Sequence, residues 1–210
     1  MALALLSNRI RATAPETFRF FAQEGVSIRV ISGDNPVTVS EVARRAGIAG
    51  AERYIDASTL KTEGDFARAA RECTVFGRVT PDNKKKLIRA MKKEGHTVAM
   101  TGDGVNDVLA LKEADCSVAM ASGSDVAAQI SDLVLMNSDF SSMPSVVAEG
   151  RRVINNIERA ASLYLVKNIF SLILAVISIT AVFSYPLSPS QLTLMSLLSI
   201  GIPSLILALE

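Results

Sequence analysis

The chain has 210 residues, of which 49% are hydrophobic and 20% are charged, and its formal net charge is +1. That length suits one compact domain, or a domain with an appendage, and it is enough to bury a hydrophobic core. Because basic and acidic residues nearly balance, the composition argues against a nucleic-acid-binding protein. Two cysteines without CxxC spacing and a single histidine exclude a zinc site and a disulfide scaffold, and they favour a reducing compartment.

Short apolar segments alternate with helical patterns over the first two thirds of the chain. We expect helices at residues 14–25, 36–46, 81–93, 107–113 and 125–130, strands at residues 26–31, 74–77, 96–100, 116–120 and 132–136, and a long helix from about residue 142. Residues 48–70 are less regular. Strands that alternate with helices predict an α/β fold, in which helices cover both faces of a parallel sheet. Ligands of such sheets bind beyond the carboxyl ends of the strands.

Two long apolar segments, residues 163–184 and 192–209, follow these elements. Each has about the length that a helix needs to cross the roughly 30 Å core of a bilayer. They could be two buried core helices, but their adjacency and the short link at residues 185–191 favour a membrane hairpin. By the positive-inside rule, residues 1–162 are cytoplasmic and the link is external, because the flanking basic residues are Arg151, Arg152, Arg159 and Lys167. The apolar stretch that opens the chain is too short for a signal peptide.

The segment VISGDNP places Ser32, Gly33 and Asp34 where a strand meets a helix. A hydroxyl beside a glycine at the start of a helix, where backbone N–H groups are free, is suited to hold a phosphate. Asn35 is expected as the N-cap of that helix, with Pro36 at its first position. An ordinary strand–turn–helix loop has the same composition, and this segment alone favours that plainer interpretation.

The segment FGRVTPDNKKK places Lys84 in the first turn of a helix that Thr80 caps and Pro81 opens. A cation is unfavourable there, because the helix dipole is positive at that end. The charge of Lys84 could instead offset that of a bound phosphoryl group. The alternative is a solvated basic helix face, which we expect for Lys85, Lys86, Lys92 and Lys93.

The segment HTVAMTGDGVND places Asp103 directly after an apolar strand, between Gly102 and Gly104. Glycines permit a tight turn and a close backbone approach. Asn106 and Asp107 follow at the start of the next helix. Two carboxylates four residues apart form a hard-oxygen site suited to Mg²⁺. A purely structural role is disfavoured, because crowded acids repel each other unless a cation or a partner compensates them.

These segments, in this order, resemble the haloacid-dehalogenase-like superfamily, and TGDGVND resembles the hinge motif of P-type cation-transporting ATPases. ISGDNPVT is similar to the TGD segment of that family, and GRVTPDNK to its R-x-x-P-x-x-K segment. EGRRVINNI and YPLSPSQL resemble the stalk that enters the fifth transmembrane helix and the link into the sixth. The resemblance implies an ATP-driven ion pump, whose Rossmann-like phosphorylation domain continues into transmembrane helices.

The resemblance also implies roles for individual residues. Ser32 and Lys84 would contact the phosphoryl group, and Asp103 would bind Mg²⁺. Asp107 would support the metal and the phosphate and is a second candidate metal ligand. The further residues near the phosphates of ATP would be Gly33, Asp34, Arg78 and Asn106.

The nucleophile of the family is the first Asp of a D-K-T-G-T motif, and this sequence contains no such motif. The closest acid–hydroxyl run begins at Asp56, which we expect in a turn and helix cap. The length of the chain also leaves no room for the nucleotide-binding and actuator domains or for four further transmembrane helices. We therefore expect the C-terminal part of a phosphorylation domain (residues 1–148), a stalk helix (149–162), a span (163–184), an external link (185–191) and a second span (192–209). The missing remainder of the pump would be its partner.

The transported cation is indicated only by small polar residues. No acidic residue occurs between Lys167 and Leu209, so a cation would be bound by hydroxyls, carbonyls and a helix broken at Gly201 and Pro203. The candidate ion path comprises Asn168, Ser171, Ser196 and Ser199, for which packing between helices is the favoured alternative. The ending IGIPSLILALE resembles a bacterial subgroup of pumps for divalent cations, with calcium as the favoured ion.

Two other functions are compatible with parts of the sequence. A membrane-anchored phosphatase of the same superfamily would need a D-x-D or D-x-T motif near the N-terminus, and none is present. A truncated regulatory protein could bind Mg²⁺ or phosphate without turnover. A D-K-T-G-T motif in the upstream coding sequence would decide for the pump. The expected location is the plasma membrane of a bacterium, with ATP as substrate.

Overall fold

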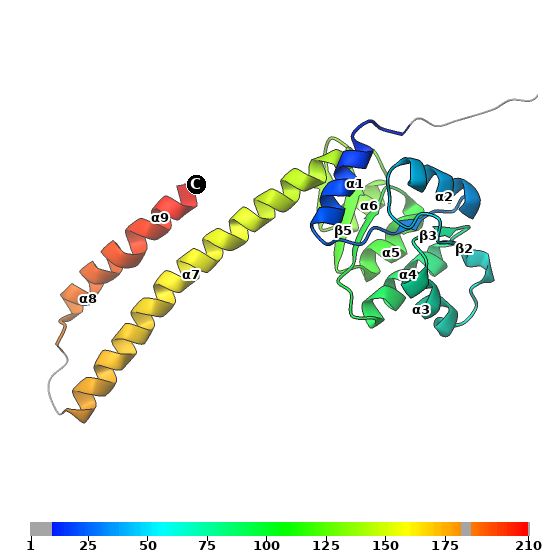
Figure 1. Ribbon diagram of the computed structural model, residues 1–210. Helices are drawn as coiled ribbons and strands as arrows, with labels where there is room; N and C mark the ends of the chain where they lie inside the picture. Colours follow the sequence, from blue (N-terminus) through cyan, green and yellow to red (C-terminus); the bar gives the residue numbers. More distant parts are fainter. Residues whose placement is uncertain (1–9, 182–185, 210) are drawn as a thin grey trace, which may run out of the picture. The chain divides into compact units, whose positions relative to one another are not determined.

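The computed structural model describes residues 10–181 and 186–209, and it divides the chain into one unit that ends at Pro144 and another that begins at Ser145. Figure 1 shows the first unit as packed helices and strands and the second as long helices. The apolar start of the chain, the last residues of the first expected span and the first residue of the expected link lie outside the described residues.

The first unit alternates helices and short strands, as the sequence predicted. Its helices are α1 Ala14–Gln23, α2 Pro36–Arg45, α3 Glu63–Glu72, α4 Pro81–Lys93, α5 Val108–Glu113 and α6 Asp125–Ile130, with 3-10 turns η1 Ala57–Thr59, η2 Val105–Asp107 and η3 Phe140–Ser142. Its strands are β1 Val30–Ile31, β2 Tyr54–Asp56, β3 Val75–Gly77, β4 Ala99–Gly102, β5 Cys116–Met120 and β6 Leu133–Leu135.

The strands form two parallel sheets where the sequence predicted one. The first sheet has the order β1-β3-β2 and the second the order β4-β5-β6. In the first, Val30 lies opposite Val75, and in the second, Met100 lies opposite Ser117. No strand pairing joins β1 to β4 within the part of the chain that the structure describes, so both are edge strands.

One hydrophobic core nevertheless spans both sheets. It contains Phe76 of β3, Met100 of β4 and Ala119 of β5, together with Leu87 of α4 and Leu111 of α5. A second, smaller cluster packs α2 against the other side of β3. Packing of apolar side chains therefore holds the two sheets together where backbone hydrogen bonds do not.

The helices begin where their capping residues predict. The Asn35 side chain accepts a hydrogen bond from the N–H of Val37 at 3.0 Å, and Thr80 caps α4 through the N–H of Asn83 at 3.3 Å. Both caps were expected, and both place a loop at the carboxyl end of a strand. β2 and α3 were not expected, because β2 has only three residues and α3 buries mainly alanines beside Phe66.

Helix α1 packs against turn η3, which directly precedes the long helix α7 (Met143–Thr180). The Phe140 ring lies 6.3 Å from the Phe18 ring and 5.7 Å from the Phe21 ring, measured between centroids. Just before α1, the Arg11 guanidinium forms an ion pair of 3.3 Å with Asp139. Aromatic contacts and an ion pair thus connect α1 and the residues just before it to turn η3.

The second unit consists of α7, α8 (Pro189–Ser196), a π-helical turn η4 (Leu197–Gly201) and α9 (Ile202–Leu209). The expected stalk and most of the first expected span form one uninterrupted helix, α7. Among the described residues, two helices are long and apolar enough to cross a membrane: Phe140–Thr180, whose apolar 18-residue window has a mean hydropathy of 2.0, and Pro189–Ile206, with 1.3. The π-helical turn interrupts the second of these near Gly201 and Pro203, where the sequence predicted a break.

Candidate functional site

The loop after β1 contains the first group of predicted site residues. The Ser32 hydroxyl accepts a hydrogen bond from the N–H of Asp34 at 3.2 Å and donates one to the Asp34 carboxylate at 3.3 Å. The carbonyl oxygen of Ser32 accepts a hydrogen bond from the N–H of Val79, at 3.0 Å, and Gly33 is exposed beside it. The loops that follow β1 and β3 therefore lie together at one edge of the first sheet.

Arg78 connects three loops at this edge. Its N–H donates a hydrogen bond of 2.7 Å to the carbonyl oxygen of Asp34, and its guanidinium donates one of 2.8 Å to the carboxylate of Asp56. Its φ of 50° lies in the left-handed region, which is unusual for a residue with a side chain. The backbone of Arg78 is thus held in a strained conformation that directs its side chain to Asp56.

Asp56 is a capping residue, as the sequence predicted. Its carboxylate accepts hydrogen bonds from the N–H of Ser58 at 3.0 Å and from the Ser58 hydroxyl at 2.6 Å. These bonds, and to a smaller extent the Arg78 guanidinium, lower the pKa of Asp56. The contact with Arg78 was not foreseen, because nothing in the sequence indicates that the loops after β2 and β3 meet.

Lys84 and Asp107 form the most buried ion pair of the described residues. The Lys84 ammonium lies 2.6 Å from Asp107 Oδ1, and their side chains are 12% and 10% exposed. The N–H of Gly104 donates to Asp107 Oδ2 at 3.2 Å. A Cβ at Gly102 would come within 2.6 Å of the Asp107 Cβ, so glycine is needed there for space. The ion pair therefore links α4, which follows β3 of the first sheet, to the TGDGVND loop, which follows β4 of the second sheet.

Asp103 differs from Asp107 in having a free carboxylate. Its side chain is exposed, and within residues 10–181 and 186–209 it makes no hydrogen bond or ion pair. Its carbonyl oxygen accepts a hydrogen bond of 2.7 Å from the N–H of Ser124, in the loop between β5 and α6. Asn106 lies in turn η2 between the two acids and is exposed.

These residues fit a magnesium site only in part. Asp103 offers a hard oxygen ligand, but both oxygens of Asp107 are already hydrogen-bonded, one of them to a cation. No cluster of three potential metal-ligating side chains occurs among the described residues. Mg²⁺ usually keeps several waters and binds through one or two carboxylates and substrate phosphates. A site of that kind can be built around Asp103.

The basic face of α4 is more structured than the sequence predicted. Lys92 forms an ion pair of 2.9 Å with Asp115, and Lys93 one of 2.8 Å with Glu63. Lys85 lies 3.9 Å from Glu113, and the Lys86 ammonium lies 5.6 Å from the centroid of the Phe66 ring. The lysines therefore join α4 to the neighbouring helices in addition to facing solvent.

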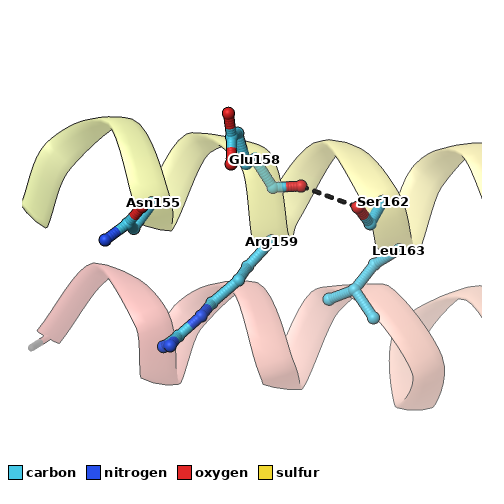
Figure 2. A pocket seen from close by; sticks show the side chains of 5 residues that line it. All are labelled: Asn155, Glu158, Arg159, Ser162 and Leu163. Atoms are coloured by element: carbon cyan, nitrogen blue, oxygen red, sulfur yellow. Dashed lines mark hydrogen bonds between the residues drawn. The ribbon is translucent and has the colours of Figure 1, made fainter. Parts of the chain in front are cut away.

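The predicted ion-path hydroxyls of the second span bond within their own helix. Ser196 donates to the carbonyl oxygen of Leu192 at 2.7 Å, and Ser199 donates to that of Met195 at 2.5 Å. Asn168 and Ser171 lie on α7. Figure 2 shows a shallow hollow on α7, lined by residues of that helix alone, namely Asn155, Glu158, Arg159, Ser162 and Leu163. None of the predicted site residues lines this hollow.

Comparison with known proteins identifies the family. Residues 2–115 match the family model described as haloacid dehalogenase-like hydrolase, and the chain belongs to this family. Over its whole length the chain is 46% identical to "Probable cation-transporting ATPase exp7" of Streptococcus pneumoniae, 28% of which is covered. "Calcium-transporting ATPase CtpE" of Mycolicibacterium smegmatis is 45% identical over 99% of the chain, which covers 27% of that protein. The chain thus spans just over a quarter of these relatives.

Among solved structures, a zinc-transporting PIB-type ATPase in the E2.Pi state has a TM-score of 0.67 to this chain. The match covers 95% of this chain and 27% of that one, at 21% sequence identity, and supports the fold alone. Together these comparisons confirm the resemblance to P-type cation-transporting ATPases. They also confirm the α/β fold of the haloacid-dehalogenase type followed by two long apolar helices.

Proposed function

We propose that the chain is part of a P-type pump that couples ATP hydrolysis, through an aspartyl phosphate, to the transport of a cation across a membrane. Calcium is the favoured cation, because relatives that share 45–46% identity with nearly the whole chain are named calcium-transporting ATPases. Residues 1–148 would belong to the phosphorylation domain, residues 149–162 to a stalk, and the two apolar helices to the membrane. The plasma membrane of a bacterium is the proposed location.

The observation that carries this proposal is the arrangement of Asp103, Lys84 and Asp107 at the carboxyl ends of the strands. Parallel α/β sheets bind their ligands at this edge. The Lys84 side chain is only 12% exposed and is paired with Asp107, so its positive charge is held in place before substrate arrives. Ser32, whose carbonyl oxygen accepts a hydrogen bond from the loop that precedes α4, would donate a hydrogen bond from its hydroxyl to the phosphoryl group.

Mg²⁺ bound at Asp103 would neutralise negative charge on the phosphoryl group. The chain's own residues would do the remaining work at this edge. Lys84 would hold a second positive charge near the phosphoryl oxygens, and Asp107 would orient Lys84 through the 2.6 Å contact. Arg78, Gly33, Asp34 and Asn106 would lie close to the phosphates of ATP.

The division into two sheets supports the idea that another segment of the pump completes the fold. β1 and β4 are both edge strands, yet the core beneath them is shared. A strand placed between them would pair with both and give a single parallel sheet. We propose that the strand with the nucleophilic Asp of the D-K-T-G-T motif occupies this place in the complete pump, between the SGD loop after β1 and the TGDGVND loop after β4.

The proposal is tested with the complete pump that contains this segment. Membranes that carry it should form an acid-stable phosphoenzyme from labelled ATP only when Mg²⁺ and the transported cation are present. Sealed vesicles should accumulate labelled calcium when ATP is added. A phosphoenzyme that forms without any cation dependence, or ATP hydrolysis without transport, would contradict the pump and favour the membrane-anchored phosphatase.

A further inference from the structure

The loop between β5 and α6 holds the backbone of Asp103 directly. Ser124 donates its N–H to the carbonyl oxygen of Asp103 at 2.7 Å. Gly123, the preceding residue, lies against the same peptide unit. A Cβ at Gly123 would come within 2.3 Å of the carbonyl oxygen of Asp103 and within 2.9 Å of its Cα.

Glycine is required at position 123 for space. Its φ lies outside the left-handed region, so its conformation is open to other residues. A real Cβ essentially never lies closer than 3.0 Å to another heavy atom, so alanine would have to push the backbone of Asp103 away. The obstructing atoms are backbone atoms, which cannot move aside by a simple rotation of a side chain.

The side chain of Asp103 has no comparable support. It is exposed and makes no contact of its own with a hydrogen-bond donor or cation in the described part of the chain. The backbone therefore fixes the point from which the carboxylate can reach a metal, and the neighbouring loop holds that backbone.

We propose that Gly123 and Ser124 are positioning residues that place Asp103 for binding of Mg²⁺. This inference rests on the proposed function, in which Asp103 is the metal ligand. Mg²⁺ demands near-ideal octahedral geometry at about 2.0–2.1 Å, so it tolerates little displacement of a ligand. A Cβ at position 123 fits only if the distance between that Cβ and the Asp103 carbonyl oxygen grows from 2.3 Å to at least 3.0 Å.

Two variants displace Asp103 by different means. Gly123→Ala adds the obstructing Cβ. Ser124→Pro removes the N–H that binds Asp103, while the φ of −74° at Ser124 suits proline and its side chain makes no capping hydrogen bond. Gly64→Ala in α3 is the matched control, because Gly64 is exposed and its nearest obstructing atom would lie at 3.7 Å.

The experiment uses the complete pump in detergent and two readouts. One is the Mg²⁺ concentration that gives half-maximal phosphoenzyme from labelled ATP. The other is the Mg²⁺ concentration that gives half of the metal-dependent rise in unfolding temperature, measured without ATP. Gly123→Ala and Ser124→Pro should both raise these concentrations by about 10- to 100-fold, the usual effect of removing the residues that orient a metal ligand. Gly64→Ala should leave them unchanged.

Folded Gly123→Ala and Ser124→Pro pumps with the Mg²⁺ dependence of the unmodified pump would overturn the inference. Failure of both variants to fold would also overturn it, because the loop would then be needed for the fold as a whole. If only one variant folds, the Mg²⁺ dependence of that variant alone tests the inference. Asp103→Asn is run beside them: if it leaves both concentrations unchanged, the proposed role of Asp103 itself is wrong, whatever the loop variants show.

Discussion

The ammonium of Lys84 and the carboxylate of Asp107 meet at 2.6 Å, and both side chains are almost completely enclosed. Neither residue can be replaced alone without leaving the other charge buried and unpaired. Removing one member of such a pair costs roughly 3–5 kcal/mol of stability. The pair therefore contributes to the fold and to the candidate site at once, and an experiment has to separate the two contributions.

A double variant makes this separation possible. Lys84→Ala should abolish phosphoenzyme formation and should also lower the unfolding temperature of the pump. Lys84→Ala combined with Asp107→Asn should recover part of the lost stability, since no buried charge is left unpaired, but it should recover no phosphorylation. Lys86→Ala is the control, because Lys86 is exposed on the same helix and forms no ion pair with the described residues. Equal loss of phosphorylation in Lys86→Ala would contradict a specific role of Lys84 in phosphorylation.

Replacement of the free carboxylate gives a second prediction. Asp103→Asn should abolish Mg²⁺-dependent phosphorylation of the complete pump, because an amide is a much weaker ligand for a hard cation than a carboxylate. The unfolding temperature should change little, since the Asp103 side chain is exposed and has no hydrogen bond or ion pair with the described residues to lose. Near-normal phosphoenzyme levels, measured after an acid quench, would contradict the assignment of Asp103 to the metal.

The 210-residue chain by itself should not form a phosphoenzyme. Asp56 begins the acid–hydroxyl run that most resembles the nucleophile motif. Its two carboxylate oxygens already accept hydrogen bonds, one from Ser58 and the other from Arg78. Covalent catalysis needs an attacking group held in line with the γ-phosphate, and the sequence contains no D-K-T-G-T motif to supply it. The check is incubation with Mg²⁺ and labelled ATP, followed by an acid quench. Stoichiometric label that hydroxylamine removes, and that Asp56→Asn prevents, would show that Asp56 is the nucleophile.

Low pH should destabilise the first unit. Hydrogen bonds from Ser117 lower the pKa of Asp132, and hydrogen bonds from Val98 and Lys92 lower that of Asp115. A carboxylate with a depressed pKa adds stability above its ordinary pKa of 3.8 and loses that contribution as the pH falls through its folded value. The urea midpoint, followed by circular dichroism, should therefore drop below about pH 4. Asp132→Asn should reduce this dependence, and an unchanged pH profile would contradict the role of Asp132.

The divided sheet predicts unequal hydrogen exchange. In the part of the chain that the structure describes, β3 and β5 are each paired on both sides, whereas β1 and β4 each have one free edge. Amides of β1 and β4 that face the free edge should exchange faster than those of β3 and β5. In a longer chain that includes the D-K-T-G-T strand, protection of β1 and β4 should rise. Equal protection of these strands in the two chains would contradict the placement of that strand between them.

Much of the fold could be predicted, because its signals are local. The caps at Asn35 and Thr80 mark the starts of α2 and α4, and apolar runs mark β4 and β5. The separation into two sheets could not be predicted, since pairing between strands depends on neighbours that are distant in sequence. β2 was missed for a related reason: a strand of three residues at the edge of a sheet has too little hydrophobic periodicity to be recognised.

Part of the candidate site could also be predicted from local sequence patterns. Acids beside glycines at a strand end, and a lysine in the first turn of a helix, are patterns that can be read from a few residues. The contacts of Arg78 with Asp56, and of Gly123 with Asp103, depend on loops that meet only after folding. The sequence analysis did not single out Gly123, although a glycine between a strand and a helix often permits close backbone approach.

The contact between α1 and turn η3 has a consequence for the integrity of the first unit. Phe18 and Phe21 pack on Phe140, and Arg11 pairs with Asp139, although 128 positions separate Arg11 from Asp139 along the chain. The start and the end of the first unit are therefore held to each other by side chains. Loss of the aromatic side chains of α1 would free both ends of this unit at once.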